Sequence, residues 1–447
     1  MGRGILPAQL SRFDEVGEQA EGKSAWKRRK GFNLTYTFAD AIKSAFGIFL
    51  FQHLSMLSYQ ESLGRGNQRK NAENILKVKE IPCNNQITRL LDGVEPEGFD
   101  ENFKEGIKQA EEYGVLEQYQ VLDGGVLVAV DGVWFQSSGK VHCDHCLHIT
   151  GKGKTTYYHS LAAAAIVRPG GNVVLPLPPE MIRNEQKPQD GGGKPANKSY
   201  EEQKQDCERK AVQRLLEKHG EYYQGLKATL LGDDLYASHN TCKAVMDRGL
   251  SFLFTCKDES HPWIAEQVAW GEVETLVVTE WDGKTRLEHR YRWVNGLENR
   301  AEGERLLVNY LSFETYNREK DKAVYKNRWI TDTPVTTETV KLLVECARAR
   351  WKIENENNNV LKNCGYHLEH NFGHGENHAC EVYCVLNLLA FMVHGLMVLC
   401  DEKFIKARSY FGRRDEFHNA LRTFLWAFEF QSWDDFLLFV ITHARGG

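Results

Sequence analysis

Three acidic residues in this chain have the setting that metal-dependent chemistry requires. Asp131 ends the apolar run VLVAVDG and Asp233 ends the run TLLGDDLY, and both runs have the composition of buried strands. Glu354 follows Arg350 by one helical turn in RWKIEN, within a segment of helical pattern. Two strand-end aspartates and a helix-borne glutamate can form an oxygen cage for two divalent cations such as Mg²⁺. A two-metal site of this kind suits phosphoryl transfer on nucleic acid.

Each of these residues also has an ordinary structural interpretation. A lone aspartate after a strand is most often a turn residue, although Gly132 would let a phosphate approach the backbone beside Asp131. The helix periodicity places Arg350, Glu354 and Asn358 on one face. There, the arginine can clamp a phosphate bidentately beside a metal-binding glutamate. The alternative is a surface ion pair worth only a few tenths of a kcal/mol.

The string WKIEN after Arg350, and the pattern Asp-x-x-Tyr from Asp233 to Tyr236, resemble the Asp-Asp-Glu (DDE) transposases of bacterial insertion sequences. The WKIEN string resembles the Tyr-Arg-Glu-Lys signature of the insertion-sequence-four group, and the resemblance covers most of the chain from about 120 to 400. It implies an RNase H-like fold, with Asp131, Asp233 and Glu354 holding two Mg²⁺ ions, for which Mn²⁺ can substitute. It also implies DNA hydrolysis at element ends, followed by strand transfer of the freed 3′-hydroxyl into target DNA.

The resemblance favours Asp233 over Asp234 as the second metal ligand, because Asp233 opens the Asp-x-x-Tyr pattern. Asp234 would then cap the next element. Two signature positions differ from the group. Ala347 stands where the tyrosine is expected, and Leu361 stands where the lysine is expected, with Lys362 next to it. In a regular helix Lys362 lies about 80° from Glu354, so it reaches the same phosphate only if the helix is irregular.

The remaining pattern predicts an α/β protein whose elements position these residues. Apolar residues at helical spacing, and a helix-turn-helix pattern around Pro82, precede a strand-rich segment and then alternating helices and strands. The Asp282-Gly283 turn indicates a hairpin in a later β-rich segment. The predicted organisation is a basic helical region over 1–115, an RNase H-like catalytic core over 120–263 and 332–400, a β-rich insertion over 264–331 and a helical C-terminal region over 401–447.

The charge of the chain is unevenly distributed. The net charge is −5, but residues 1–90 contain 14 Lys and Arg against 8 Asp and Glu. That segment therefore carries +6 and the remainder −11. A basic DNA-contacting end joined to an acidic catalytic body fits this asymmetry. The predicted DNA-contacting residues are Arg350, Lys362 and the cluster Lys27, Arg28, Arg29 and Lys30. A solvated basic tail is the alternative for that cluster.

Length and composition indicate a globular protein of two or three domains, with 447 residues and 42% hydrophobic content. The eleven cysteines form no evident disulfide framework and no secretory signal is visible. We therefore expect a cytoplasmic protein. The resemblance to DDE transposases implies that it is associated with the nucleoid and binds DNA as a homodimer or higher oligomer. The apolar segment from Ala379 to Cys400 contains Glu381 and His394, which favours a buried core helix over a membrane span.

A second group of residues has the chemistry of metal ligands. Cys143-x-x-Cys146 is flanked by His142, His145 and His148, and His159 or Cys207 would complete a zinc site. A hairpin tip with free thiols is the alternative, since no second Cys pair stands at ligand spacing. For the histidines further along the chain we expect loop positions that contact DNA or cover the site: His367, His370, His374 and His378.

Two other functions are compatible with the sequence. One is an RNase H-like nuclease that cuts DNA without strand transfer. The other is a domesticated transposase that binds DNA without catalysis. Three converging buried carboxylates would disfavour the second alternative, because binding alone does not require them.

Overall fold

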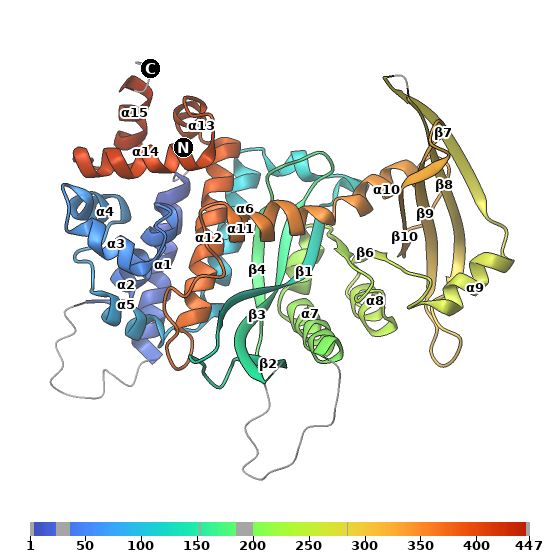
Figure 1. Cartoon of the computed structure of the whole chain (residues 1–447), viewed down its shortest axis with the longest axis horizontal. Coiled ribbons are helices and arrows are strands. Elements are labelled where there is room, and N and C mark those ends of the chain that lie inside the picture. Colours follow the sequence, from blue (N-terminus) through green and yellow to red (C-terminus); the bar gives the residue numbers. More distant parts are fainter. Residues whose placement is uncertain (1–3, 24–35, 152, 185–199, 284, 444–447) are drawn as a thin grey trace, which may run out of the picture.

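The computed structural model describes residues 4–23, 36–151, 153–184, 200–283 and 285–443, and it describes the side chains of the helix at 200–225 from Glu208 onwards. The protein is a mixed α/β structure in which one large, mostly antiparallel sheet joins two ends of different character (Figure 1). Most of the N-terminal helices and the C-terminal helices gather at one end. The last four strands form the other end.

The N-terminal region is helical as far as the first strand. Amphipathic spacing and polar caps account for its helices; the hydroxyls of Thr37 and Ser55, for example, cap α2 and α3 by accepting backbone N–H groups. Three short 3₁₀ turns follow or interrupt the α-helices. The elements are α1 (Ile5–Lys23), α2 (Phe38–Leu50), α3 (Met56–Leu63), α4 (Gln68–Leu76), α5 (Asn84–Leu91), η2 (Pro96–Phe99), α6 (Asp100–Glu112), η3 (Leu116–Tyr119) and η4 (Leu122–Gly124).

The central sheet begins with an antiparallel meander and continues in parallel strands. In the order β4-β3-β1-β5-β6, β1 pairs antiparallel with β3, β3 antiparallel with β4, and β1, β5 and β6 run parallel to one another. Strand β2 lies on the other part of β3. These elements are β1 (Leu127–Ser138), β2 (Leu147–Gly151), β3 (Lys154–Val167), β4 (Leu175–Ile182), α7 (Tyr200–Gly225), β5 (Thr229–Gly232), α8 (His239–Met246) and β6 (Ser251–Thr255).

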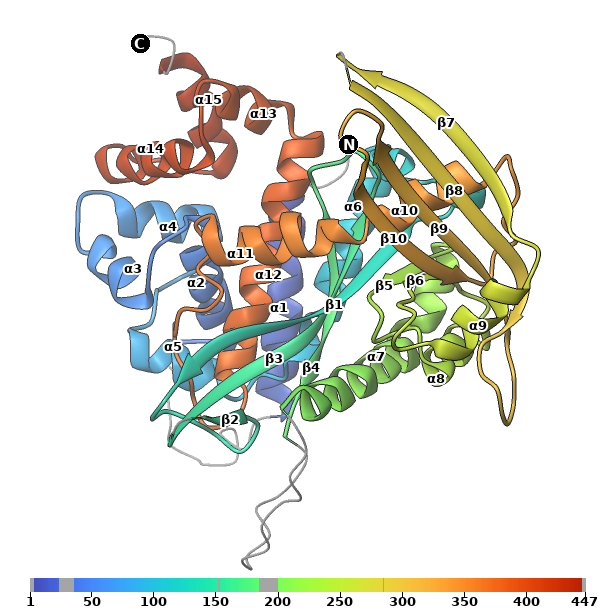
Figure 2. The same ribbon diagram turned by 45° about the vertical axis from the view of Figure 1, so that its right-hand side comes forward.

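Four long strands extend the same sheet beyond β6. Strand β10 pairs antiparallel with β6 and the order continues through β9, β8 and β7, which gives the curved surface seen in Figure 2. Residues 264–270, expected to open the β-rich segment, are instead helical, since Pro262 starts a helix and strand alternation begins only at Glu274. The elements are α9 (Pro262–Trp270), β7 (Glu274–Asp282), β8 (Thr285–Glu298), β9 (Leu307–Asn317) and β10 (Lys322–Thr331).

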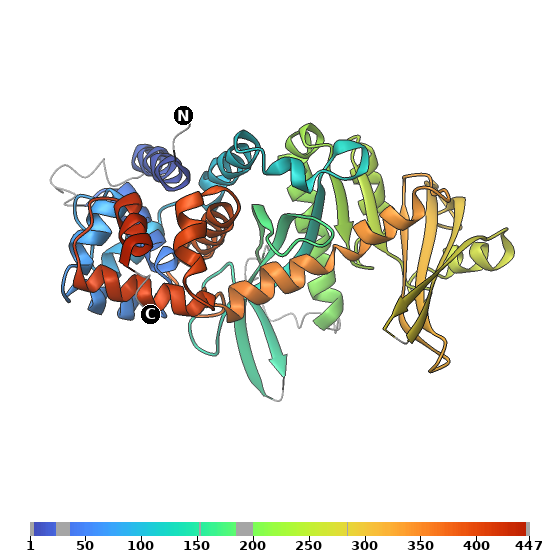
Figure 3. The same ribbon diagram turned by 90° about the horizontal axis from the view of Figure 1, so that it is seen from above.

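A helical segment then crosses the molecule from the β-rich end to the helical end (Figure 3). It is not one regular helix. A turn at Ala349 and Arg350 separates α10 from a π-helical turn that carries Glu354. The elements from this point are α10 (Val340–Arg348), η5 (Ile353–Asn358), α11 (Asn359–Asn363), α12 (Ala379–Cys400), α13 (Glu402–Ser409), α14 (Arg414–Ala427) and α15 (Trp433–His443).

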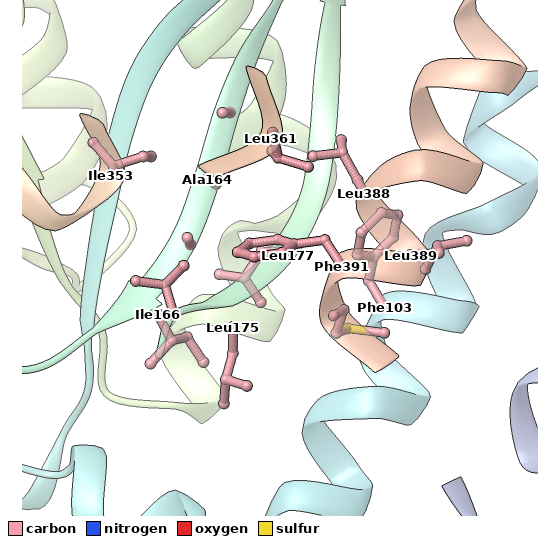
Figure 4. Packing of buried hydrophobic residues seen from close by; sticks show 14 of the residues in the cluster. Phe103, Ala164, Ile166, Leu175, Leu177, Ile353, Leu361, Leu388, Leu389 and Phe391 are labelled. Carbon is pink, nitrogen blue, oxygen red and sulfur yellow. The ribbon is translucent and has the colours of Figure 1, made fainter. Parts of the chain in front are cut away.

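Helix α12 is the centre of the helical end. It packs against α1, α2, α5, α6 and β4, and 83% of its most apolar 18-residue window is buried within the protein. Figure 4 shows Leu388 and Phe391 of α12 beside Leu177 of the sheet and Phe103 of α6. The segment from Ala379 to Cys400 is therefore an interior helix, as its sequence predicts.

The same core fixes the segment that carries Glu354. Ile353 and Leu361, which flank the π turn and the start of α11, are fully buried against the sheet (Figure 4). The π turn contacts both β1 and β3, and β3 contains the sequence LAAAAIV. Because alanine side chains are small, a helix can approach such a strand closely. The buried alanine run therefore leaves room for the Glu354 segment beside β1 and β3.

The C-terminal helices are attached to the N-terminal ones through a buried amide. Asn71 Nδ2 donates hydrogen bonds to the carbonyls of Leu425 (2.6 Å) and Phe428 (2.7 Å), and Asn71 Oδ1 accepts from the backbone N–H of Phe430 (2.7 Å). Asn71→Ala should lower the free energy of unfolding by about 2–4 kcal/mol, since it leaves buried backbone groups unpaired. Chemical denaturation monitored by circular dichroism measures this loss.

A neighbouring asparagine provides the matched control. Asn67, also at α4, donates a single longer bond (3.3 Å) to the carbonyl of Ala427 near the surface. Asn67→Ala should cost less than about 1 kcal/mol. Equal losses for the two variants would contradict the claim that Asn71 is the attachment point.

Candidate active site at the ends of β1 and β5

The first two acidic residues are placed by the parallel pairing of β1 with β5. Val128 and Ala129 lie beside Leu230 and Leu231 in this register. Two residues beyond the last of these pairs, each chain reaches its aspartate, Asp131 on β1 and Asp233 just after β5. Adjacent strands lie about 4.8 Å apart, and residues two positions along a strand share one face. The two side chains therefore reach the same space at one edge of the sheet.

The π turn brings the glutamate segment to this edge. It contacts β1 and β3, and Asn358 Nδ2 donates a hydrogen bond to Asp131 Oδ2 at 3.0 Å. One turn earlier, Arg350 Nη1 lies 2.7 Å from Glu354 Oε1. The Arg350 side chain is 8% exposed, and its guanidinium lies over the ring of Trp351 at 4.5 Å. The pair of Arg350 with Glu354 is therefore not an ordinary surface ion pair, because the arginine side chain is buried.

A π turn lies between Arg350 and Lys362. A π turn has more residues per turn than an α-helix, and such turns occur frequently at functional sites. The helix is irregular between Glu354 and Lys362, which is the condition under which Lys362 could reach the phosphate beside Glu354. Lys362 Nζ forms an ion pair with Glu369 Oε1 at 2.8 Å. Its contact with DNA stays a prediction.

The pKa shifts of the aspartates show that the acidic groups lie close enough to affect one another. Burial, together with the charges of Glu354, Glu208 and Asp233, raises the pKa of Asp131 to about 7, and the charge of Arg350 opposes this rise. Burial also raises the pKa of Asp233, against the N–H of Leu235 and the charge of Arg350. The structure thus brings Asp131, Asp233 and Glu354 together. Their catalytic role stays a prediction.

A fourth carboxyl group belongs to the cluster. Glu208 on α7 is 6% exposed, and a Cβ atom built on Gly132 would lie only 1.3 Å from Glu208 Oε1. Since successive strand residues point to opposite faces, Gly132 faces away from the side chain of Asp131. The missing side chain at Gly132 therefore lets a carboxylate from the other face approach β1 next to Asp131.

Sequence reasoning missed Glu208, although a signal was present. Ala211, Val212 and Leu215 form an apolar stripe on α7 and are fully buried. Glu208 stands at the helical spacing that opens this stripe, where an apolar residue is expected. An acid on the buried face of a helix is a candidate site residue, because burying a charged group is costly and such costs are retained mainly at functional sites.

The structure separates the roles of the adjacent aspartates. Asp234 faces the loop after β6, where it accepts hydrogen bonds from the backbone N–H of Lys257 (2.6 Å) and the hydroxyl of Ser260, and lies 3.4 Å from His261 Nε2. These contacts hold its pKa below the usual range. Asp233 instead faces the acidic cluster. The geometry therefore assigns Asp234 to the fold and leaves Asp233 at the site.

Tyr236 is a buried residue close to the acidic cluster. Its side chain is 1% exposed, and its hydroxyl has no hydrogen-bond partner among the described residues. Burial raises its pKa well above 10, and the charges of Glu208, Asp131 and Asp233 add to that effect. The hydroxyl therefore stays protonated, close enough to the carboxyl groups to be affected by their charge. This tyrosine is the one that the Asp-x-x-Tyr pattern singles out.

The other predicted contact residues lie elsewhere. Lys27, Arg28, Arg29 and Lys30 are outside the described residues. Among the basic residues near α4, Arg69 pairs with Glu73 (3.0 Å) and Lys70 with Glu429 (3.2 Å). The basic character of residues 1–90 is thus partly neutralised within the described helices.

The Cys-x-x-Cys motif lies in a separate group. Residues 141–146 form a loop, in which the Cys146 N–H donates a hydrogen bond to the carbonyl of Cys143 (3.2 Å). The donor atoms of four residues lie within 4.8 Å of one another, an arrangement that could bind a metal such as zinc: Cys143, Cys146, His159 and His374. His374 was expected only to contact DNA or cover the site. The side chain of Cys207 is outside the described residues.

Comparisons with known proteins give little further information. No family model matches the sequence, and no curated protein matches it. Among solved structures, a piggyBac transposase synaptic complex with hairpin DNA aligns with 98% of this chain and 83% of that chain, at 10% identity and a TM-score of 0.39. A similarity of that size assigns neither fold nor function, and nothing in the comparisons supports membership of the insertion-sequence-four group.

The raised pKa of Asp131 predicts how the metal-free protein responds to pH. In the unfolded chain this group ionises near pH 4, and in the folded chain near pH 7. Between these values the folded state holds a proton that the unfolded state has lost, so stability falls as pH rises from about 4 to about 7. In EDTA, Asp131→Asn should remove this loss while keeping the bond from Asn358.

Thermal unfolding of the wild type and the variant at a series of pH values tests this expectation. The melting temperature of Asp131→Asn should exceed that of the wild type increasingly up to about pH 7. Asp282→Asn, in an exposed hairpin turn, is the control and should follow the wild type. A constant difference between Asp131→Asn and the wild type across this range would contradict the burial of Asp131 among other carboxylates.

The different environments of Asp233 and Asp234 give a second prediction. Asp233→Asn should reduce Mn²⁺ affinity at least tenfold in calorimetric titration, with little change in melting temperature. Asp234→Asn should lower the melting temperature, since it weakens the contacts with Lys257 and Ser260, and should leave Mn²⁺ affinity within about twofold. The reverse pattern would show that the assignment between the two aspartates is wrong.

Proposed function

We propose that this protein is a DDE-type DNA transposase that cleaves DNA and transfers the strand to a target with divalent cations held by Asp131, Asp233 and Glu354. The observation that carries the proposal is the convergence of these carboxyl groups at the ends of the parallel strands β1 and β5. The strand order β4-β3-β1-β5-β6 supports an RNase H-like core, since it has an antiparallel meander followed by two parallel strands.

The donor set fits hard divalent cations. Asp131, Asp233, Glu354 and Glu208 supply carboxylate oxygens to the cluster, and Mg²⁺ and Mn²⁺ prefer such ligands. Four carboxyl groups against the single guanidinium of Arg350 leave an excess of negative charge when they ionise. Bound divalent cations would supply charge neutralisation, an activated water and stabilisation of the departing 3′ oxygen.

The surrounding residues have separate tasks in this proposal. Asn358 orients Asp131 through its hydrogen bond at 3.0 Å. The buried core around Ile353 fixes the height of Glu354 above β1. Arg350, held over Trp351, keeps a planar guanidinium beside the reacting phosphate, where two parallel N–H donors can bind two phosphate oxygens. Glu208 on α7 adds negative charge from the face of β1 opposite the Asp131 side chain.

The partners follow from the reaction. The substrates are the ends of a DNA element and a target duplex, and the protein would act as a homodimer or higher oligomer that holds two ends together. The basic segment around Lys27–Lys30 and the surface of the helical region over 1–115 would bind element DNA. The curved strands β7–β10 of the insertion would provide a second DNA surface. The protein would act in the cytoplasm, on the DNA of the nucleoid.

Separate measurements of cleavage and binding test the proposal. The DNA is a duplex containing the inverted repeat that flanks the coding sequence, labelled at its 3′ end. Asp131→Asn, Asp233→Asn and Glu354→Gln should each reduce Mg²⁺-dependent cleavage at least a thousandfold and change the dissociation constant for this DNA less than about threefold, since phosphate contacts supply most affinity. Arg350→Ala should also reduce cleavage more than binding.

Asp415→Asn, which changes an exposed residue of α14, is the control and should cleave at the wild-type rate. Cleavage that proceeds in the Asp131→Asn or Glu354→Gln variant would overturn the assignment of the site. Products that are cut but never joined to target DNA would instead support an RNase H-like nuclease. Binding without cleavage in either Mg²⁺ or Mn²⁺ would support a DNA-binding protein that lacks catalysis.

A further inference from the structure

The Cys and His group lies where three distant segments meet. Cys143 and Cys146 come from the loop between β1 and β2, and His159 comes from β3. His374 comes from the segment that joins α11 to α12, 215 residues after His159. Phe135 of β1 pairs with His159, and the register shifts immediately afterwards at a β-bulge. Such bulges redirect side chains beside functional sites.

Five of the six distances between the donor atoms can be compared with the edges of a tetrahedral zinc site, and they lie within about 0.4 Å of them. With Zn–S bonds of about 2.3 Å and Zn–N bonds of about 2.0–2.1 Å, the edges are about 3.8 Å for S–S, about 3.6 Å for S–N and about 3.3 Å for N–N. The two sulfurs lie 3.9 Å apart. Cys143 Sγ and Cys146 Sγ lie 3.6 Å and 3.2 Å from His159 Nε2. His374 Nε2 lies 3.4 Å from both Cys146 Sγ and His159 Nε2.

The orientation of His374 is fixed as in a metal ligand. Its Nδ1 lies 2.8 Å from the carbonyl of Gly375, to which it donates a hydrogen bond. In the neutral ring the proton is then on Nδ1, so Nε2 presents a lone pair to the group. The segment itself is held by Asp92, whose carboxylate accepts the N–H groups of residues 376–379 at 2.9–3.1 Å. His374 is therefore positioned before any metal binds.

Burial and charge point to a divalent soft metal. Cys146, His159 and His374 are 4%, 2% and 8% exposed, and Cys143 is partly buried. Two thiolates and two neutral imidazoles balance the charge of one Zn²⁺, so the complex is neutral and suits the protein interior. The four donor atoms all lie within 4.8 Å of one another, so one ion can contact all of them.

We propose that Cys143, Cys146, His159 and His374 bind one structural Zn²⁺. Four protein ligands leave no open position, which is the arrangement of structural rather than catalytic zinc. The ion links the β1–β3 ribbon, which carries Asp131, to the segment that follows the Glu354 helix. It thereby closes a chain loop of more than 200 residues. This inference does not depend on the proposed transposase activity.

Metal content is the direct test. The full-length protein, purified without a metal-affinity tag and dialysed, should contain about one zinc per chain by inductively coupled plasma mass spectrometry. Cys143→Ser and His374→Ala should each lose at least four fifths of it. Cys83→Ser and His370→Ala, which change an exposed cysteine and an exposed histidine outside the group, should retain it. Zinc that is absent from the wild type, or unchanged in Cys143→Ser and His374→Ala, would overturn the site, and stoichiometric iron would overturn the choice of metal.

A second measurement on the wild type avoids variants that fail to fold. Iodoacetamide labelling followed by peptide mass spectrometry should modify Cys83 at once, and Cys143 and Cys146 at least tenfold faster after treatment with a zinc chelator than before it. The chelated protein should also melt several degrees lower, and added Zn²⁺ should restore both properties. Equal labelling of Cys143 with and without chelator would overturn the proposal. Because Mg²⁺-dependent cleavage is not measured, failure here leaves the carboxylate site untouched, and the reverse also holds.

Discussion

The structure is organised around mutual repulsion between carboxyl groups that the fold forces together. Asp131, Asp233, Glu354 and Glu208 come from four elements and meet at one edge of the sheet, with Arg350 as the compensating charge. Burial removes the water that would screen them, so the pKa of Asp131 rises to about 7. Such an arrangement costs stability unless cations or protons occupy it. Folds retain such costs mainly at functional sites.

Several local features make sense only as consequences of this cluster. Gly132 leaves the volume that the Glu208 carboxylate occupies. The alanine run of β3 lets the Glu354 segment lie close to the sheet, and the π turn places Asn358 within hydrogen-bond distance of Asp131. The group containing His374 holds the chain just after that segment. Each of these features helps to fix the position of a carboxyl group in the cluster.

The sequence predicted what depends on local pattern. Asp131 and Asp233 could be predicted as site residues because an apolar run that ends in an acid is visible in the sequence. Helix α12 could be predicted as a core helix because apolar residues occupy all of its faces. Glu208 was missed because its burial depends on Gly132, 76 positions earlier in the chain. His374 was not paired with Cys143 because no spacing rule connects residues so far apart. The π turn and the continuation of the sheet from β6 into β10 also arise from tertiary packing.

One measurement tests the central claim most directly. Crystals grown with MnCl₂ should be examined at the manganese absorption edge, for the wild type and for Asp131→Asn. The account predicts anomalous density between Asp131, Asp233 and Glu354 in the wild type, with Arg350 displaced from Glu354, and loss of that density in the variant. Manganese density that is absent from this position while the three carboxyl groups remain clustered would contradict the account.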